Sequence, residues 1–220
     1  MGSSSMKRLL VLRTSLFPGP HKVSATPQFV SGPARIQQYV EGLSLIVPII
    51  HALDSDVQVA LVDNTTSHAC QVPDSIVKLL PSEAVLWLAD LNQFGKRNKG
   101  AGDIQVWRRY APAIAEYERI VHFEPKLHVT NLDSFARLIS NDQDYIAEAN
   151  SKQVKTGYLS LSTDRLLTFA SNVNIFSMTA FRQPIETLLR KYAIQRSIHL
   201  CDEVPWTKRF DPTSETWINY

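Results

Sequence analysis

The chain has 220 residues, of which 44% are hydrophobic and 20% are charged, and its formal net charge is +2. This length and composition are typical of one globular domain with its own core. The near-neutral net charge gives no electrostatic case for nucleic-acid binding, which usually needs a concentrated basic face. No apolar run reaches the roughly 20 residues of a membrane span.

The chain begins with MGSSS, which is typical of a cloning remnant over residues 1–5, so we expect Met6 to be the natural start and a single domain to cover residues 6–220. Cys70 and Cys201 show no metal-ligand spacing and are typical of reduced thiols. With no signal-peptide pattern, these features predict a cytoplasmic protein.

Short apolar runs alternate with helical patterns through the first two thirds of the chain. The apolar runs predict buried strands, and apolar residues at helical spacing predict helices. The predicted strands cover residues 7–13, 57–62, 84–88 and 119–123. The predicted helices cover residues 35–53, 73–80, 102–117 and 131–140, with Pro48 and Pro112 expected to kink or divide two of them.

The pattern weakens after Gly157. Strands over residues 158–161 and 173–178 and a helix over 180–194 are expected, whereas residues 199–220 show no clear period. Because strands and helices alternate over most of the chain, we predict an α/β fold with a mainly parallel sheet flanked by helices on both faces. In such sheets, ligands bind outside the carboxyl ends of the strands.

Polar residues follow the first two predicted strands. Thr14 and Ser15 come after the first strand and offer small hydroxyls where a backbone must approach a ligand closely. Asp63 and Asn64 come after the second strand, where the Asp63 carboxylate could accept hydrogen bonds from a base or ribose. The alternative for this pair is a plain polar turn.

The segment Lys99-Gly100-Ala101-Gly102-Asp103 is predicted to be a loop that opens a helix, and Lys96 and Arg97 precede it. Glycines beside cations let backbone N–H groups face an anion such as phosphate. The spacing matches neither a Walker loop nor the dinucleotide fingerprint. The alternative is a solvated basic loop with glycine at a turn.

Glu124 and Lys126 lie just past the fourth predicted strand, at alternating positions that share a face in extended chain. The carboxylate could hold a divalent cation or contact sugar hydroxyls. The lysine could offset diphosphate charge without any metal. The alternative is a surface ion pair, which would contribute little to stability.

With these residues in order, the chain resembles the nucleotide-sugar-dependent glycosyltransferases of the GT-A fold, in a bacterial or viral polysaccharide-type branch. The resemblance covers about Lys7 to Phe135, with a weaker likeness from Gly157 to Leu189, and rests on ordered short motifs. These are a Thr-Ser pair after the first strand, a Ser-x-x-Arg-x-x-Gln-type segment at residues 31–38, an Asp after the second strand, a Lys-Gly-x-Gly-Glu segment with Asp in place of Glu, and the polar triplet within residues 123–127.

The resemblance implies one Rossmann-like GT-A domain, with a nucleotide-binding half over about residues 6–135 and an acceptor-side half over about residues 136–220. It assigns Asp63 to the nucleotide base and the polar triplet to the sugar and diphosphate. The residues it implies for donor binding are Arg13, Thr14, Ser15, Arg35, Asp63, Asn64, Lys99, Gly100, Gly102, Asp103 and Lys126.

The chain departs from this family at the metal motif. GT-A enzymes usually carry Asp-x-Asp at the fourth strand, where it binds a metal that bridges the diphosphate, but this chain has Glu124-Pro125-Lys126. Two readings therefore stay open: Glu124 alone holds Mn²⁺ or Mg²⁺, or Lys126 takes over the charge of the metal in a metal-independent mechanism.

The resemblance implies transfer of a sugar from a nucleotide-diphosphate donor, with a UDP-sugar favoured, to a glycan or other hydroxyl acceptor. An inverting enzyme needs a carboxylate base at the acceptor. The family places that base in the C-terminal third, which indicates Glu186, then Asp202 and Glu203. The alternative for Glu186 is a helix-surface residue, and a retaining enzyme would need no such base.

Two other functions compete with this one. A sugar-phosphate nucleotidyltransferase would need a Gly-rich, basic loop directly after the first strand, and residues 14–20, TSLFPGP, do not supply it. A non-catalytic nucleotide- or glycan-binding module of degenerate GT-A fold is favoured by the missing second Asp of the metal motif. Release of free nucleotide diphosphate would separate an enzyme from a binding module.

Overall fold

The computed structural model describes residues 7–17, 32–89, 93–201, 206–211 and 216–219. Within these residues, seven strands form one sheet in the order β3-β2-β1-β4-β7-β6-β8, and three form a second sheet in the order β10-β9-β5. The strands are β1 (Arg8–Thr14), β2 (Val57–Asp63), β3 (Val85–Leu88), β4 (Arg119–Phe123), β5 (Leu127–Val129), β6 (Tyr145–Asn150), β7 (Gln153–Ser162), β8 (His199–Cys201), β9 (Trp206–Asp211) and β10 (Thr216–Asn219).

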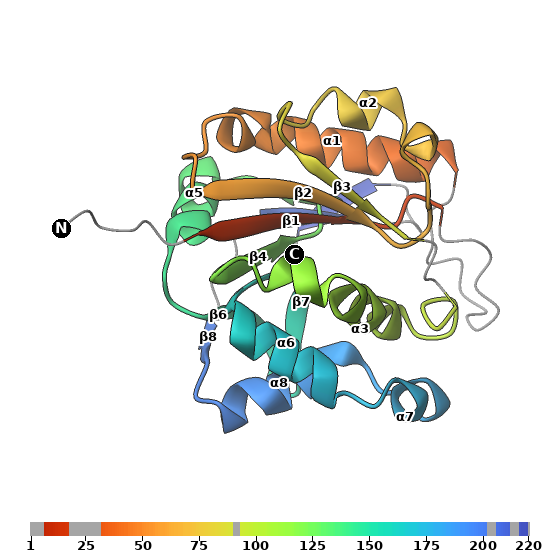
Figure 1. Cartoon of the computed structure of the whole chain (residues 1–220), viewed down its shortest axis with the longest axis vertical. Helices are drawn as coiled ribbons and strands as arrows, with labels where there is room; N and C mark the ends of the chain where they lie inside the picture. The colour runs from red at the N-terminus through yellow and green to blue at the C-terminus, as the bar shows by residue number, and fades with distance from the viewer. Residues whose placement is uncertain (1–6, 18–31, 90–92, 202–205, 212–215, 220) are drawn as a thin grey trace.

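Helices cover both faces of the main sheet (Figure 1). α1 (Pro33–Ile50), α2 (Asp74–Val77) and α5 (Leu132–Ser140) lie on one face. α3 (Lys99–Arg109), α4 (Ala111–Ile114), α6 (Thr163–Asn172), α7 (Ile175–Ala180) and α8 (Ile185–Gln195) lie on the other. A short 3-10 helix covers Ala69–Gln71. The α/β fold with a mainly parallel sheet between helices is thus confirmed.

The core divides into two layers because side chains of a strand alternate between its faces. Leu9 and Val11 of β1 pack into the cluster that includes α3, α6 and α8 residues. Leu10 and Leu12 pack into the opposite cluster, with residues of α1 and α5. The continuous apolar run of β1 therefore follows from burial on both faces, as expected for a central parallel strand.

Strand register aligns the carboxyl ends of β1, β2 and β4. β1 pairs in parallel with β2 up to Thr14 opposite Asp63, and with β4 up to Leu12 opposite Phe123. The chain leaves β1 to form β2 on one side and returns to form β4 on the other, so the gap between β1 and β4 is the topological switch point. β7 runs antiparallel to β4, and its first residues extend past the end of β4.

Some expected elements differ from the structure. Residues 173–178, expected as a strand, belong instead to α7, whose start is capped by Asn174 accepting a hydrogen bond from the Ser177 N–H at 3.0 Å. Pro48 does not divide α1, which continues to Ile50. Strands β5 and β6, helix α6 and the strands within residues 199–220 were not predicted, since their apolar residues are few or lack a period.

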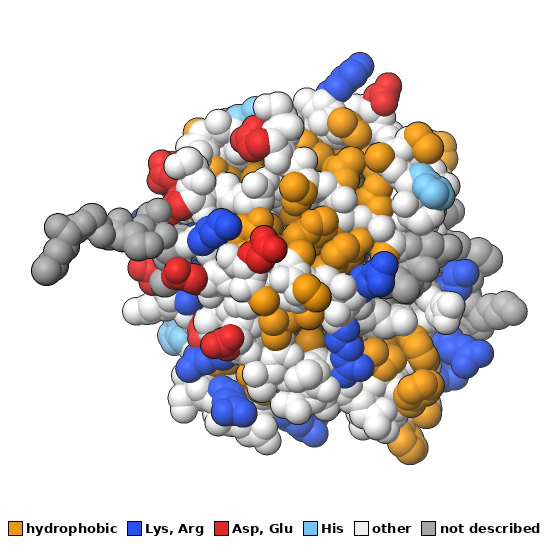
Figure 2. Space-filling view, viewed as in Figure 1, with side chains coloured by type: hydrophobic (Ala, Val, Ile, Leu, Met, Phe, Trp, Pro, Cys, Tyr) orange, Lys and Arg blue, Asp and Glu red, His pale blue; other side chains and the backbone are white. Residues whose placement is uncertain are grey.

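One end of the molecule carries exposed aromatic side chains. Phe176 of α7 is 74% exposed, and Phe181, which directly follows this helix, is 75% exposed. Figure 2 shows hydrophobic side chains beside Lys and Arg side chains at the lower right, where Figure 1 places α7. Among the helices that the structure describes, none combines the length and the apolar character needed to cross a membrane.

Candidate functional site

Asp63 joins the carboxyl ends of β1 and β2. Its Oδ2 accepts hydrogen bonds from the Thr14 hydroxyl at 2.9 Å and the Leu16 N–H at 2.8 Å. Its Oδ1 accepts from the N–H and hydroxyl of Thr65, both at 2.6 Å, and from the Thr66 N–H at 3.0 Å. Because these five bonds occupy the buried carboxylate, a nucleotide base could bind Asp63 only by replacing one of them.

Arg35 fixes the chain that leaves β1. Its Nε donates to the Ser15 carbonyl at 3.2 Å, and its Nη2 donates to the Tyr39 hydroxyl at 3.1 Å. The same hydroxyl accepts the Ser15 N–H at 3.0 Å. Burial raises the pKa of Tyr39, although the Arg35 guanidinium opposes that rise. Arg35 and Tyr39 therefore hold Ser15 beside the strand ends.

Residues 99–103 are the first turn of α3 and not the loop that the sequence predicts. Asn98 is the N-cap, and its side-chain oxygen accepts the Ala101 N–H at 3.3 Å. A Cβ on Gly100 would lie 2.4 Å from the Cβ of Ile185. Gly100 is therefore needed where α3 packs on α8, a structural role that the phosphate-loop interpretation missed.

Arg13 and Asp103 form a buried ion pair that ties β1 to α3. The Arg13 Nε and Nη2 lie 2.9 and 2.8 Å from Oδ1 of Asp103. The side chains are 5% and 6% exposed, so removal of either partner would leave a charge in the interior. Since Asp103 follows Lys99 by about one helical turn, this pair also positions Lys99.

Glu124 lies one residue past β4 and binds two ammonium groups. Lys99 Nζ is 2.9 Å from Oε1 and 3.2 Å from Oε2, and Lys126 Nζ bonds to Oε2. The Glu124 side chain is 6% exposed, compared with 46% for Lys99 and 24% for Lys126. With two ammonium groups for one carboxylate, the Glu124 cluster (Lys99, Glu124 and Lys126) carries a net positive charge while Lys126 is protonated, and burial lowers the pKa of Lys126 to about 7.

Burial and charge act in opposite directions on these groups. Burial would raise the pKa of Glu124, but the ammonium groups of Lys126 and Lys99 outweigh it and hold that pKa well below its ordinary value. Burial lowers the pKa of Lys126, Glu124 opposes this, and the charges of Lys99 and Arg35 lower it further. A second anion beside Lys126 would relieve that repulsion, so the cluster suits an anionic ligand.

The backbone around Glu124 is held in place by close packing. Glu124 N–H donates to the Gly157 carbonyl of β7 at 2.8 Å, and Leu127 N–H donates to the Glu124 carbonyl at 3.0 Å. A Cβ on Gly42 of α1 would lie 1.5 Å from the Pro125 oxygen, so only glycine allows the turn to rest there. No sequence pattern predicts this contact between α1 and the turn.

These residues do not fit a divalent cation as they stand. Both Glu124 oxygens contact ammonium groups, and a metal at the same carboxylate would face the repulsion of Lys99 and Lys126. Elsewhere in the described part of the chain, no three His, Cys, Asp or Glu side chains gather as a possible metal site. The arrangement favours a phosphate oxygen at the ammonium groups.

Glu186 is the one candidate base that the structure describes. It lies in the first turn of α8, half-buried, and its Oε1 accepts the Thr156 hydroxyl at 3.4 Å. Thr156 directly precedes Gly157, which bonds to Glu124. Glu186 therefore lies near the Glu124 cluster. Asp202 and Glu203 lie outside the described residues.

The structure brings most of the predicted donor-site residues to one edge of the sheet. Arg13, Thr14, Ser15, Asp63 and Asn64 lie at the ends of β1 and β2, and Arg35 reaches them from α1. The first turn of α3 contributes a further group, which contains Lys99, Gly100, Gly102 and Asp103. Their roles toward a donor remain predictions.

Comparison with known proteins identifies the fold. Neither a protein-family model nor a curated protein sequence matches this chain. A protein of Desulfovibrio desulfuricans G20 described as a nucleotide-diphospho-sugar transferase aligns over 89% of this chain and 78% of its own, with a TM-score of 0.53 and 9% identity. Mannosyltransferase PcManGT from Pyrobaculum calidifontis, solved with GDP-Man and Mn²⁺, aligns over 90% of this chain and 55% of its own, with a TM-score of 0.54 and 9% identity.

At these identities the likeness concerns the fold alone. The fold shared with these two structures is Rossmann-like, with a mixed, mostly parallel sheet between helices. What the chain binds must therefore be argued from its own residues.

Proposed function

We propose that this chain is a glycosyltransferase that moves a sugar from a nucleotide-diphosphate donor to a hydroxyl of a glycan acceptor. The observation that carries the proposal is the Glu124 cluster, which places two ammonium groups at the switch point of the sheet. Negative charge develops on the departing diphosphate during sugar transfer, and preorganised cations stabilise it. The fold shared with nucleotide-sugar transferases supports this reading.

In the proposed reaction, Lys99 and Lys126 bind the diphosphate and Glu124 holds both ammonium groups in place beforehand. This saves the reorganisation that free lysine side chains would need. The ends of β1 and β2, with Ser15, Asp63 and Asn64, adjoin the nucleoside. Lys99 is 46% exposed and can turn toward a ligand, whereas Lys126 is more enclosed.

Glu186 is the proposed base for an inverting transfer. Its carboxylate would take the proton of the acceptor hydroxyl as that oxygen forms a bond to the donor sugar carbon. The bond from that carbon to the diphosphate oxygen breaks, and its electron pair leaves with the diphosphate. Glu186 accepts a hydrogen bond from Thr156, and the next residue, Gly157, accepts one from the Glu124 N–H. This short connection between Glu186 and the Glu124 cluster supports the role of Glu186 as the base.

Calorimetric titration with UDP and GDP, each with and without Mn²⁺, tests the proposal. Micromolar binding that ignores the metal is expected if Lys126 and Lys99 supply the positive charge. Binding that requires Mn²⁺ would assign Glu124 to a metal and contradict the ammonium mechanism. Absence of binding by both nucleotides would refute the transferase.

Turnover separates the enzyme from a binding module. A transferase incubated with its donor slowly releases free nucleotide diphosphate, even to water, whereas a binding module releases none. The departure of Glu124-Pro125-Lys126 from Asp-x-Asp is the observation that favours the module. A panel of UDP- and GDP-sugars followed by phosphatase-coupled detection would show which description holds.

A further inference from the structure

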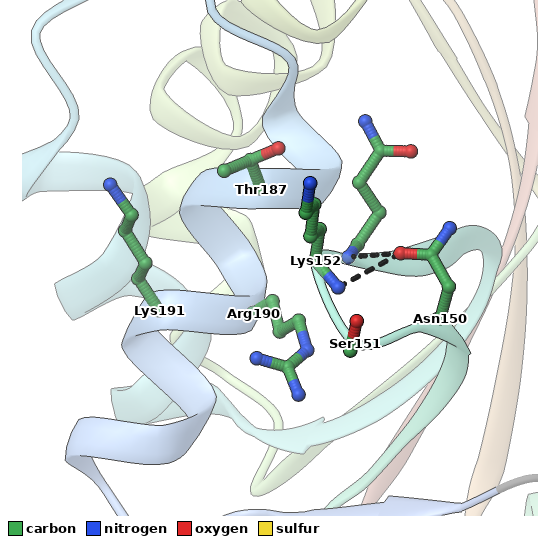
Figure 3. A pocket seen from close by; sticks show the side chains of 7 residues that line it. Asn150, Ser151, Lys152, Thr187, Arg190 and Lys191 are labelled. Carbon is green, nitrogen blue, oxygen red and sulfur yellow. Dashed lines mark hydrogen bonds between the residues drawn. The ribbon is translucent and has the colours of Figure 1, made fainter.

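A pocket lies between the β6–β7 turn and α8 (Figure 3). Its volume is about 530 Å³, and it is lined by residues 150–153 of the turn and by Thr187, Arg190 and Lys191 of the helix. Pockets for small ligands commonly have volumes of ~300–1,000 Å³. The pocket is thus large enough for a small ligand.

The lining is strongly cationic. Lys152, Arg190 and Lys191 are basic, and the lining includes no acidic residue. Glu148 accepts hydrogen bonds from Nε and Nη2 of Arg190 at 3.1 and 2.8 Å, which orients the guanidinium. Lys152 and Lys191 have no carboxylate partner among the residues that the structure describes. After the pairing with Glu148, two positive charges remain for a ligand.

The turn that forms one wall is fixed by its own hydrogen bonds. The Asn150 side-chain oxygen accepts the N–H of Lys152 at 2.8 Å and the N–H of Gln153 at 3.0 Å. Figure 3 shows these bonds, with Arg190 extending from α8 toward the turn at Ser151. The wall is therefore held in shape before a ligand arrives, which lowers the ordering cost of binding.

The pocket and the Glu124 cluster both lie past the carboxyl end of β4. β7 begins beyond the end of β4, and Gly157 bonds to Glu124 four residues after the turn residue Gln153. At ~3.3 Å per residue, the turn lies roughly 13 Å along β7 from that point. Glu186, which bonds to Thr156, lies one residue before Thr187 of the pocket.

We propose that this pocket binds the phosphate group of a phosphorylated acceptor. The role of the ligand as an acceptor rests on the proposed function, whereas phosphate binding itself rests only on the pocket. Glu186 lies between the Glu124 cluster and the pocket, so an acceptor anchored there by its phosphate would present a hydroxyl near the proposed base. Glu148 engages the Nε and Nη2 groups of Arg190, so the Nη1 end of the oriented guanidinium is the part that can donate to a phosphate oxygen.

Amide NMR of the full chain titrated with inorganic phosphate tests the proposal. We expect shifts at residues 150–153 and 187–191 that persist when UDP or GDP is saturating. The Lys152→Gln/Lys191→Gln variant should raise the Kd for phosphate about tenfold, because it removes two charge-assisted contacts. The matched control is Lys78→Gln/Arg137→Gln, which removes two exposed charges elsewhere and should leave the Kd unchanged.

The two proposals can fail separately. Phosphate shifts confined to residues 13–15, 99–103 and 124–126, or no shifts at all, would overturn the pocket assignment. Unchanged nucleotide affinity in Lys152→Gln/Lys191→Gln would leave the proposed function standing. Glucose 1-phosphate and vesicles containing phosphatidic acid then distinguish the source: shifts at the pocket with the sugar phosphate indicate a free acceptor, and shifts only with the vesicles indicate a lipid headgroup.

Discussion

Lys126→Met should weaken nucleotide binding, whereas Glu124→Gln should not abolish it, if the cluster is a site for a diphosphate. Glu124→Gln removes the one negative charge, while the amide still fills the space. Lys126→Met removes an ammonium group that contacts Glu124 and keeps most of the aliphatic stem. A metal site at Glu124 predicts a different outcome, namely that Glu124→Gln abolishes binding.

The size of the effect follows from the charges. A unit charge ~4 Å from an ammonium group interacts by ~4 kcal/mol at an effective dielectric constant of ~20. Part of this is lost because Lys126 already pairs with Glu124 and is 24% exposed. A net loss of ~1.5–3 kcal/mol, typical of a hydrogen bond to a charged group, would raise the Kd of UDP or GDP by roughly 10- to 150-fold in Lys126→Met.

Calorimetric titration at pH 6 and low salt measures both variants. The pH matters because burial lowers the pKa of Lys126 and Glu124 opposes that effect, so loss of the carboxylate would favour the neutral amine at higher pH. We expect Glu124→Gln to keep metal-independent binding, because loss of the competing carboxylate offsets loss of the contacts that hold Lys99 and Lys126 in place. Abolished binding by Glu124→Gln, with its fold verified by thermal unfolding, would refute the ammonium mechanism, as would an unchanged Kd in Lys126→Met.

Four further substitutions test the packing, the buried pair, the pH dependence and the base. Gly100→Ala should destabilise the fold by about 1–3 kcal/mol, because its Cβ would lie 2.4 Å from a side-chain atom of α8; urea unfolding measures this, and an unchanged midpoint would contradict the contact. Asp103→Asn should cost about 3 kcal/mol in the same assay, since it leaves a buried guanidinium without its carboxylate, and a cost below about 1 kcal/mol would refute that role. Burial lowers the pKa of His122 to about 4, so the unfolded chain takes up the proton first as the pH falls below about 6.5; stability should drop by about 2 kcal/mol from pH 7 to pH 5, and His122→Leu should remove that part of the slope. Glu186→Gln should lower turnover by at least about 100-fold with unchanged nucleotide affinity, and intact turnover would remove it as the base.

The strands and their common edge could be predicted from sequence because burial on two faces leaves a plain signal. β1 and β2 each contain four consecutive apolar residues, and β4 contains Ile120, Val121 and Phe123, so the positions of these strands and the polar residues after them can be predicted. Parallel pairing then brings those ends together whatever the details of the helices. The predicted strand over residues 173–178 was wrong because a short apolar stretch fits either a strand or a helix. The N-cap at Asn174 favours the helix, α7.

The partners of Glu124 were harder to predict, because they depend on how whole helices are placed. Lys126 is a near neighbour in sequence, but Lys99 is 25 residues away and reaches Glu124 only because α3 begins at Lys99 and points its first turn at the end of β4. A loop at residues 99–103, as predicted, would not fix that geometry. The sequence therefore indicated the charged groups near the site without showing how they pair.

Two glycines explain why the cluster forms where it does. Gly42 allows the Pro125 carbonyl to rest against α1, which sets the turn that carries Glu124 and Lys126. Gly100 allows α3 to rest against α8, which sets the start of the helix that carries Lys99. The sequence pattern of Gly100 and Gly102 predicts backbone N–H groups that approach phosphate. The packing instead indicates that Gly42 and Gly100 act at a distance, by bringing side-chain cations to the one carboxylate at the switch point.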